Sequence, residues 1–292
     1  MLAAVIWGLS FVAQKSGASI GTFTFNGIRT VMGGLALLPL VPVFGSKQKK
    51  NAGQDGEKKY TFKRTLFCGS ACGAVLFIAS NLQQHAFSFD ITAGKVGFIT
   101  ALYMILVPLA GLFSGRKIRL NVWVALALGI TGLYFLCINK GDFGVGKGEI
   151  FSVLCAVMFA AHILTVDRFC TEAEPVALSC TQFLVAGTLS VICMFIFEKP
   201  DISEIMKHSA ELLYAGIAST GIAFTLQVFG QKYTEPAVAS LLMCLESVFS
   251  AIFGRFLLND TMGPRAIAGC AIMFAGVVLS QLDFRKGEKN NG

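Results

Sequence analysis

Apolar residues fill blocks of about twenty positions along almost the whole chain, and short polar stretches separate these blocks. A helix rises about 1.5 Å per residue, so about 20 apolar residues are needed to cross a hydrocarbon layer about 30 Å thick. Few residues remain outside these blocks, too few for a separate soluble domain. The pattern therefore predicts an all-α integral membrane protein with ten transmembrane helices, at about residues 2–20, 22–44, 66–88, 93–113, 119–138, 148–167, 176–197, 209–230, 236–257 and 264–283.

The two halves of the chain resemble each other. The stretch 102–113 (LYMILVPLAGLF) aligns with 245–256 (LESVFSAIFGRF) at an offset of 143 residues. Glycine and polar positions match as well as apolar ones, and the same offset pairs Gln84 with Gln227. Upstream, the match continues at an offset of 153, because the first half contains a longer loop. The sequence thus predicts an internal repeat.

Five spans in each half have a consequence for topology. Because five is odd, the second half must enter the bilayer from the side opposite to the first, which gives two inverted repeats. Many secondary transporters that work by alternating access are built in this way. We place the first repeat at residues 1–140, the second at 148–284, and a basic tail at 285–292.

Composition supports the membrane assignment. Of the 292 residues, 54% are apolar and 14% are charged, whereas soluble globular domains carry about 25% charged residues. The nine cysteines contain no C-x-x-C pair and lie mostly in apolar stretches, so they indicate neither a disulfide framework nor a zinc site. We expect them to be packing residues, and we expect no metal and no cofactor.

Basic residues predict the orientation. If both termini are cytoplasmic, 15 of the 24 Lys and Arg residues fall on the cytoplasmic side, many of them in the basic loop 45–65. Cytoplasmic loops of membrane proteins carry such an excess. The net charge of +7 therefore indicates membrane orientation and not nucleic-acid binding. We expect a multi-pass protein in the cytoplasmic membrane of a bacterium, with the lipid bilayer as its surroundings and both termini inside.

Six short motifs resemble a known family. They are AVIWGLSFVAQK at 4–15, FTFNGIR at 23–29, NLQQH at 81–85, TAGKVGFITALY at 92–103, TLQVFGQ at 225–231 and ASLLMCLE at 239–246. Through these motifs the whole chain is similar to the EamA-type, ten-helix branch of the drug/metabolite transporter superfamily.

The resemblance implies a cavity between two five-helix repeats, lined by the first, third, fourth and sixth to ninth spans. It also implies export or exchange of small organic solutes such as amino acids, sugars or drug-like amphiphiles. One departure concerns the ninth span, where the family often has Glu-Pro and this chain has Ser247 after Glu246. Because this proline is missing, the sequence alone does not predict a kink in the ninth span.

Glu246 is the most informative polar residue of the predicted spans. It lies ten residues into the ninth span, about 15 Å along the helix and hence near the midplane. A charged side chain at that depth costs about 2.5–3.5 kcal/mol or more unless it faces a wet cavity or a partner. We expect a substrate-binding and proton-coupling carboxylate; a structural hydrogen bond to a neighbouring helix is the alternative.

Other polar and aromatic residues in the spans are candidates for the same site. We expect Arg29 or Lys95 to contact an anionic group, with a fixed counter-ion or helix contact as the alternative for Arg29 and snorkelling to water for Lys95. The residues expected to shape the pocket are Gln84, Gln227, Trp7, Tyr103, Asn81 and His162, for which interhelical hydrogen bonds or plain packing are the alternatives. Tyr103 is singled out because it is the repeat partner of Glu246.

Together these observations predict a secondary transporter that moves a small organic metabolite outward by alternating access. It would act as a monomer or homodimer, with protons as the candidate coupling ion. Two other classes stay open at this point: a non-transporting membrane scaffold or sensor, and an intramembrane enzyme. A clustered nucleophile and base would favour the enzyme, and a cavity too narrow for any solute would favour the scaffold.

Overall fold

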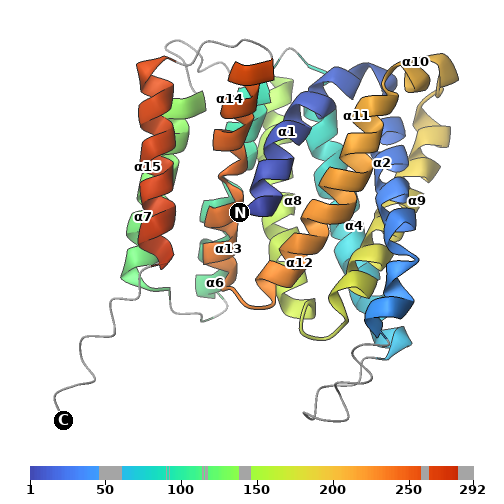
Figure 1. Ribbon diagram of the computed structural model, residues 1–292, viewed down its shortest axis with the longest axis horizontal. Helices are drawn as coiled ribbons and strands as arrows, with labels where there is room; N and C mark the ends of the chain where they lie inside the picture. The colour runs from blue at the N-terminus through green and yellow to red at the C-terminus, as the bar shows by residue number, and fades with distance from the viewer. Residues whose placement is uncertain are drawn as a thin grey trace.

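The computed structural model in Figure 1 describes residues 1–45, 61–89, 91, 93–113, 115, 118–137, 146–257 and 263–281. Within these ranges all regular secondary structure is helical. The elements are α1 (Leu2–Ser16), η1 (Gly17–Ile20), α2 (Thr22–Leu37), α4 (Phe62–Ala86), α5 (Ala93–Thr100), α6 (Tyr103–Phe113), α7 (Leu120–Cys137), α8 (Lys147–Phe169), α9 (Pro175–Phe197), α10 (Ile202–Lys207), α11 (Ser209–Leu213), η2 (Tyr214–Phe224), α12 (Thr225–Gln231), α13 (Pro236–Met243), α14 (Glu246–Leu257) and α15 (Pro264–Gln281).

The helices form ten segments that run up and down in turn (Figure 1). Three segments are interrupted: α5 continues into α6, α13 into α14, and α11 through η2 into α12. Six segments are long and apolar enough to cross a membrane, while α7 and α15 are shorter apolar helices. The prediction of an all-α membrane protein with ten helices in two inverted repeats is confirmed.

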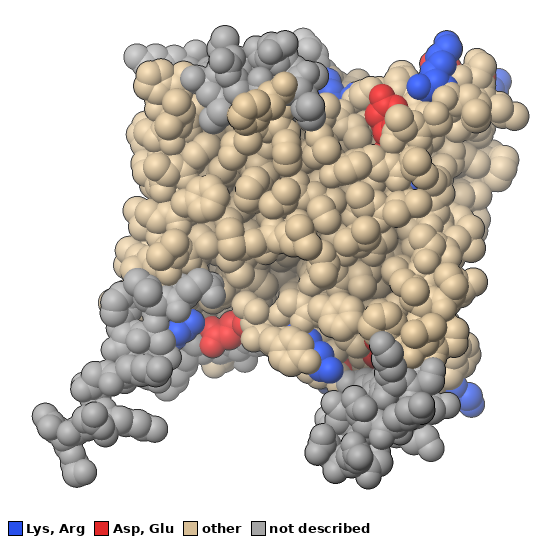
Figure 2. Space-filling model, in the orientation of Figure 1, with Lys and Arg blue, Asp and Glu red and all other residues tan. Residues whose placement is uncertain are grey.

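On the outer face of the helical bundle shown in Figure 2, charged side chains lie near its two ends. In Figure 2 the visible Lys, Arg, Asp and Glu residues lie near its upper and lower edges, and uncharged residues cover the broad band between them. We call the edge with the connections 170–174 and 232–235 the lower face, and the edge with the connections 17–21 and 198–208 the upper face (Figure 1). The uncharged band is the surface that a bilayer would cover.

The packing between helices follows the internal repeat. The last spans of the two repeats, α7 and α15, pack on each other, and so do the second spans, α2 and α9. The contact of α4 with α8 is matched by that of α1 with η2, and the contact of α4 with α9 by that of α2 with η2. Exchange of the two repeats thus leaves the set of main helix contacts unchanged.

Glycines allow the closest of these contacts. A Cβ atom on Gly132 of α7 would lie 2.6 Å from the carbonyl oxygen of Gly269 on α15, and one on Gly269 would lie 2.5 Å from that of Gly132. Neither position has room for a side chain, so the two backbones meet directly. Small residues serve such close approaches in membrane proteins.

The fourth and ninth spans break at equivalent positions. The fourth span stops at Thr100 and resumes at Tyr103, and the ninth stops at Met243 and resumes at Glu246. A tight turn bridges each break, with Met104 N donating to Ala101 O at 3.0 Å in the first repeat. The ninth span is therefore interrupted even though no proline follows the glutamate. The repeat offset of 143 residues holds across both breaks.

The eighth span contains a wide π-helical segment, η2. Thr220 Oγ1 donates to Ala215 O at 2.8 Å, a bond that reaches back five residues. This segment packs on α2, where a Cβ atom on Gly33 would lie 2.7 Å from the Thr220 side chain. Widened turns of this kind often occur at functional sites.

Candidate functional site: a cavity between the repeats

A cavity with about 490 Å³ of empty space, including its opening to solvent, lies between the two repeats. Helices of both repeats line it, among them both helices that start after the breaks in the fourth and ninth spans. Its lining residues are Trp7, Phe11, Gln14, Arg29, Gln83, Thr100, Tyr103, Phe159, Ile163, Ser219, Phe224, Gln227, Met243 and Glu246.

The two repeats contribute to the cavity in similar ways. The first helix of each repeat provides an aromatic residue and the residue four positions later, which lie on one face of the helix: Trp7 and Phe11 on α1, Phe159 and Ile163 on α8. At the breaks, Thr100 and Tyr103 of the first repeat are matched by Met243 and Glu246 of the second. The cavity therefore follows the axis that relates the repeats.

Tyr103 and Glu246 join the repeats in the wall of this cavity. The Tyr103 hydroxyl donates to Glu246 Oε1 at 3.2 Å, and both residues are buried. Tyr103 is the first residue of α6 and Glu246 the first of α14. Helix N-termini carry partial positive charge, so the breaks in both spans direct such charge towards the cavity.

Arg29 on α2 is the cation of the cavity wall. Only 4% of it is exposed, and its Nε atom is buried without a hydrogen-bond partner. The guanidinium carbon lies 5.7 Å from the centre of the Phe25 ring. Among the described residues, no carboxylate forms an ion pair with it, Glu246 included. Arg29 therefore stands in the wall as an uncompensated charge.

Three further polar atoms in the lining are buried without a partner: Trp7 Nε1, Gln14 Oε1 and Gln227 Oε1. Gln227 uses its amide nitrogen to bond Gln231 Oε1 at 2.9 Å, and Gln231 in turn donates to Ile163 O at 2.8 Å. Buried polar groups in native proteins are usually satisfied by protein or water. Further unpartnered atoms lie outside the lining, among them Gln84 Oε1 and His162 Nδ1, but the four within it face one cavity and could bind a polar ligand.

Two of the predicted site residues lie behind the wall and hold it in place. Gln84 does not line the cavity; its amide nitrogen donates to Gln14 O at 3.0 Å and so ties α4 to α1. His162 is bonded to Gln182, with 3.1 Å between His162 Nε2 and Gln182 Oε1, and its ring contacts Phe224 edge to face. Both therefore position lining residues.

Asn81 belongs to a separate polar cluster between α2, α4 and α9. Its amide nitrogen donates to Phe77 O at 2.8 Å and to Ser190 Oγ at 2.9 Å, and its oxygen accepts from Asn26 Nδ2 at 3.1 Å. Asn26 also donates to Ser80 O at 2.9 Å. This cluster connects three helices and lies outside the cavity lining.

Lys95 lies near the upper face, at the start of the fourth span. Its ammonium forms an ion pair with Glu149 Oε1 of α8 at 2.7 Å. The two side chains are 10% and 15% exposed, and Lys95 is not part of the cavity lining. Arg29, in contrast, lies in the lining itself.

Several lining residues were not predicted from the sequence, among them Gln83, Thr100 and Ser219. Gln83 adjoins a predicted residue, and successive residues of a helix point about 100° apart. Thr100 precedes the predicted Tyr103 by three positions, but the helix breaks between them, so regular helical spacing does not explain why both line the cavity. Nothing in the sequence distinguished Ser219 from the other small polar residues of the spans.

A metal site was not expected from the cysteine pattern. Among the described residues, no group of three or more His, Cys, Asp or Glu side chains is arranged to hold a metal ion. Of the titratable groups in the cavity wall, only Tyr103 and Glu246 contact each other. The arrangement is suited to binding through one cation, one carboxyl group and several amides and hydroxyls.

Comparison with known proteins gives one consistent result. The EamA-like transporter family matches this chain twice, over residues 1–138 and 146–282. An uncharacterized transporter of Archaeoglobus fulgidus is 26% identical over 96% of this chain and 84% of its own. The uncharacterized transporter YoaV of Bacillus subtilis is 22% identical over 97% of this chain and 95% of its own.

A solved crystal structure shares the fold. It superposes with a TM-score of 0.73 at 18% sequence identity and covers 96% of this chain and 94% of that chain. At this identity the likeness concerns the path of the backbone and not the chemistry of the site.

Proposed function

Because the chain belongs to the EamA-like transporter family, we propose that it is a secondary transporter. It moves a small organic metabolite, such as an amino acid or a drug-like amphiphile, outward by alternating access. In this proposal it lies in the cytoplasmic membrane of a bacterium, with both termini and the lower face in the cytoplasm. Residues 1–140 and 148–284 are the two repeats that move against each other, in a monomer or a homodimer, and 285–292 is the cytoplasmic tail.

The observation that carries this proposal is the bond between Tyr103 and Glu246 in the cavity wall. The two residues belong to different repeats, so relative movement of the repeats changes their bond. Gain or loss of a proton by Glu246 changes the strength of the same bond, because a carboxylate accepts more strongly than a carboxylic acid. Glu246 is therefore the proposed proton-coupling residue.

The other residues have graded roles in the proposal. Trp7 and Gln227 contact the substrate through their unpartnered atoms, and Arg29 is the cationic contact. Gln84 and His162 act through the lining residues that they hold, and Asn81 through the helices that it connects. Lys95, paired with Glu149, belongs to the upper entrance.

The test is a mass-spectrometric comparison of medium and cell contents. Cells that overproduce the wild-type chain are compared with cells that make equal amounts of Glu246→Gln and with cells carrying an empty vector. We expect one class of metabolite to leave the cells only with the wild type. Once it is named, transport into proteoliposomes should depend on pH for the wild type and lose that dependence in Glu246→Gln.

Glu235→Gln is the matched control, since Glu235 is an exposed carboxylate before the same span and its side chain makes no capping bond. It should export like the wild type. If Glu246→Gln also exports equally at every pH, Glu246 is structural and the coupling proposal fails. If the wild type does not differ from empty cells, outward transport is wrong.

A further inference from the structure

The charge balance of the cavity indicates what kind of molecule fills it. Arg29 and Glu246 are the charged residues among the lining residues that the structure describes. A guanidinium stays protonated at any physiological pH, whereas a carboxyl group can become neutral by taking up a proton. A buried cation without a partner is expensive, and the cost is greatest in a low-dielectric surrounding. Among the described residues no carboxylate pairs with Arg29, so an anionic ligand group would lower this cost.

Two more features favour an anion at this place. The helices α6 and α14 begin in the cavity wall, at Tyr103 and Glu246, and their N-termini carry partial positive charge. In transporters, such half-helices direct their N-termini at anionic groups of the substrate. The Glu246 carboxyl is meanwhile bonded to the Tyr103 hydroxyl and forms no ion pair with Arg29 among the described contacts.

The rest of the wall defines the body of the ligand. Aromatic rings form part of it, with Trp7 against Phe224 at 4.8 Å between ring centres and in edge-to-face contact. Phe11, Phe159 and Met243 extend this apolar surface. One cation suits a monoanion, and a planar guanidinium matches the two oxygens of a carboxylate.

We propose that the substrate is an organic monoanion whose carboxylate binds the Arg29 guanidinium. Its body is aromatic or branched and apolar, and cationic amphiphiles are not carried. This inference rests on the proposed transport function and narrows its substrate class. Zwitterions with a free carboxylate fall within the class. Permanently cationic compounds fall outside it, because they leave Arg29 unpaired and add a second positive charge.

Binding to the purified protein is measured first, with probes that share one phenyl body: 3-phenylpropanoate, phenylalanine, phenyl phosphate and benzyltrimethylammonium. We expect the two carboxylates to raise the thermal unfolding temperature of the wild type, and the quaternary ammonium to leave it unchanged. Arg29→Gln should weaken carboxylate binding about tenfold or more. Arg29→Lys keeps the positive charge but loses the two parallel N–H donors. Its affinity for the carboxylates should therefore lie between those of the wild type and Arg29→Gln.

The outcomes separate this inference from the proposed function. If benzyltrimethylammonium binds as well as the carboxylates, or folded Arg29→Gln binds carboxylates like the wild type, the anion assignment is wrong. Stronger binding of phenyl phosphate than of both carboxylates would overturn the choice of a carboxylate. If carboxylates bind through Arg29 but proteoliposomes do not transport them, the transport function fails while the assignment of the site holds.

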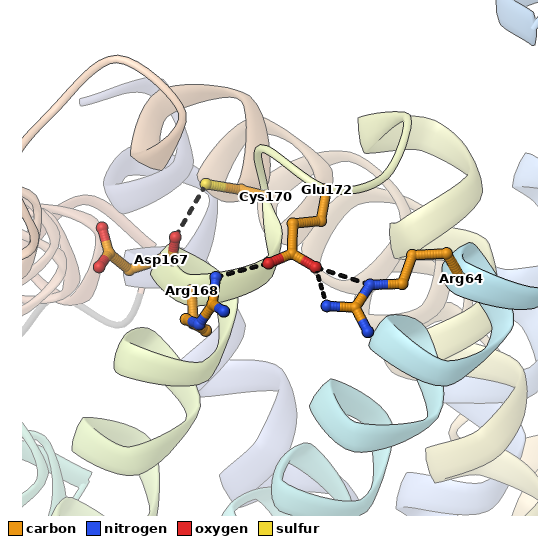
Figure 3. A network of polar contacts seen from close by, with 5 residues as sticks. All are labelled: Arg64, Asp167, Arg168, Cys170 and Glu172. Carbon is orange, nitrogen blue, oxygen red and sulfur yellow. Dashed lines mark hydrogen bonds and ion pairs between the residues drawn. The ribbon is translucent and has the colours of Figure 1, made fainter. Parts of the chain in front are cut away.

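A second inference comes from polar contacts at the two faces of the molecule. At the lower face, Arg64 Nε donates to Glu172 Oε2 at 2.7 Å, and Arg168 also bonds this carboxylate (Figure 3). Arg64 lies in the first turn of α4, the third span, and Glu172 in the connection between α8 and α9. This contact therefore joins the first repeat to the second.

The upper face has an equivalent contact between the repeats, in which serine hydroxyls take the place of the arginine. Ser16 Oγ donates to Glu211 Oε1 at 2.9 Å, and Ser19 Oγ lies 3.2 Å from His208 Nε2. His208 caps the start of the eighth span and Glu211 lies in its first turn, while Ser16 ends α1 and Ser19 lies in η1, between α1 and α2. Exchange of the repeats maps the third span onto the eighth and the connection α8–α9 onto α1–α2.

We infer that these two equivalent contacts act as latches, one at each face, and that breaking the lower latch releases its face more than breaking the upper latch releases the other. Below, the contact between the repeats joins two ions, Arg64 and Glu172, whereas above it joins the neutral Ser16 hydroxyl to a carboxylate. The lower latch is therefore the stronger of this equivalent pair. The ion pair of Lys95 with Glu149 is a further contact between the repeats near the upper face and lies outside the two latches. This inference too rests on alternating access, but its test needs no substrate.

Trp7 is a natural reporter for this test, because it lines the cavity and the chain has two tryptophans. In a Trp123→Phe background, a membrane-impermeant quencher is added to one side or the other of oriented proteoliposomes. We expect Glu172→Gln to raise quenching of Trp7 from the lower face about two- to fivefold. Glu211→Gln should raise it from the upper face by a smaller factor.

Lys63→Gln, which alters an exposed cation beside Arg64 in the first turn of α4 but outside the latch, is the control and should leave quenching unchanged. Unchanged quenching in folded Glu172→Gln, or equal increases from both sides, would overturn the latch assignment. A substrate assay in the same vesicles reports separately on whether transport occurs.

Discussion

Two polar regions meet α4, and the α4 amides that belong to them differ in how completely they are paired. In the cluster between α2, α4 and α9, the amide of Asn81 bonds three neighbours. Two residues further along the same helix, Gln83 lines the cavity and makes no side-chain hydrogen bond among the described residues. Both amide side chains are buried, but only that of Asn81 is hydrogen-bonded to other protein groups within the described residues.

The difference shows how structural and functional polar groups can be told apart in a membrane protein. A paired group such as Asn81 lowers the free energy of the folded state by itself. An unpaired one, such as Arg29 or the Trp7 indole, costs free energy unless water or a ligand pairs it. Unpartnered atoms of Trp7, Gln14, Arg29 and Gln227 line one cavity, which is why we assign the substrate to it.

The largest effect on stability is expected at the paired cluster. Asn81→Ala leaves Asn26 and Ser190 without one of their partners, and should lower the free energy of unfolding by about 1–2 kcal/mol. Thermal unfolding of the purified protein measures this. Gln83→Ala on the same helix is the matched control and should leave stability unchanged. Equal losses in both variants would show that the two regions do not differ.

A smaller effect, of the opposite kind, is expected at Trp7. Trp7→Phe removes the unpartnered Nε1 donor and keeps an aromatic ring against Phe224. Stability should change by less than about 0.5 kcal/mol. Substrate affinity should fall about three- to tenfold if the indole donates to the ligand. Titration of the ligand identified by the export experiment measures this, and unchanged affinity would remove Trp7 from the polar contacts.

Lys95 is another paired residue, so its replacement should affect stability and not substrate binding. Lys95→Met breaks the ion pair with Glu149, and should cost about 1 kcal/mol or less because both side chains reach the upper edge of the bundle. Affinity for the substrate should not change. Glu149→Gln should cost a similar amount, and the double variant little more than either alone. A large loss of affinity in Lys95→Met would place this lysine in the binding site after all.

The smallest expected effect concerns pH and the lower latch. The hydrogen bond from Arg64, followed by the charges of Arg64 and Arg168, lowers the pKa of Glu172 below its ordinary value of 4.5. A lowered folded-state pKa stabilises the fold above the ordinary pKa, and this contribution is lost as the pH falls through the folded value. Unfolding temperatures of wild type and Glu172→Gln should therefore converge below about pH 4.5. A difference that stays constant with pH would contradict this.

Much of the fold could be read from the chain. The apolar blocks predicted the spans to within a few residues, since the hydrophobic length needed to cross a bilayer is a local property. The repeat predicted that Tyr103 and Glu246 occupy equivalent places, and the structure joins them directly. The break before Glu246 could not be derived in this way, because no proline marks it and its equivalent lies at Ala101 and Leu102.

The site was less predictable than the fold. Trp7, Tyr103, Arg29, Gln227 and Glu246 line the cavity, whereas Gln84, Asn81, His162 and Lys95 bond to other protein groups. Their contributions to transport stay predictions. A helix turns by about 100° per residue, so a small rotation decides whether Gln83 or Gln84 faces the cavity.

The sequence by itself determined the number of spans, their repeat and the presence of costly polar residues within them, because apolar length and residue type are written position by position. Only the tertiary structure decided which polar groups find partners. A polar group is paired only if a neighbouring helix places a hydrogen-bond donor or acceptor within about 3 Å of it. Arg29 is the clearest case: its charge is evident from the sequence, but the lack of a counter-charge beside it emerges only when the helices are packed.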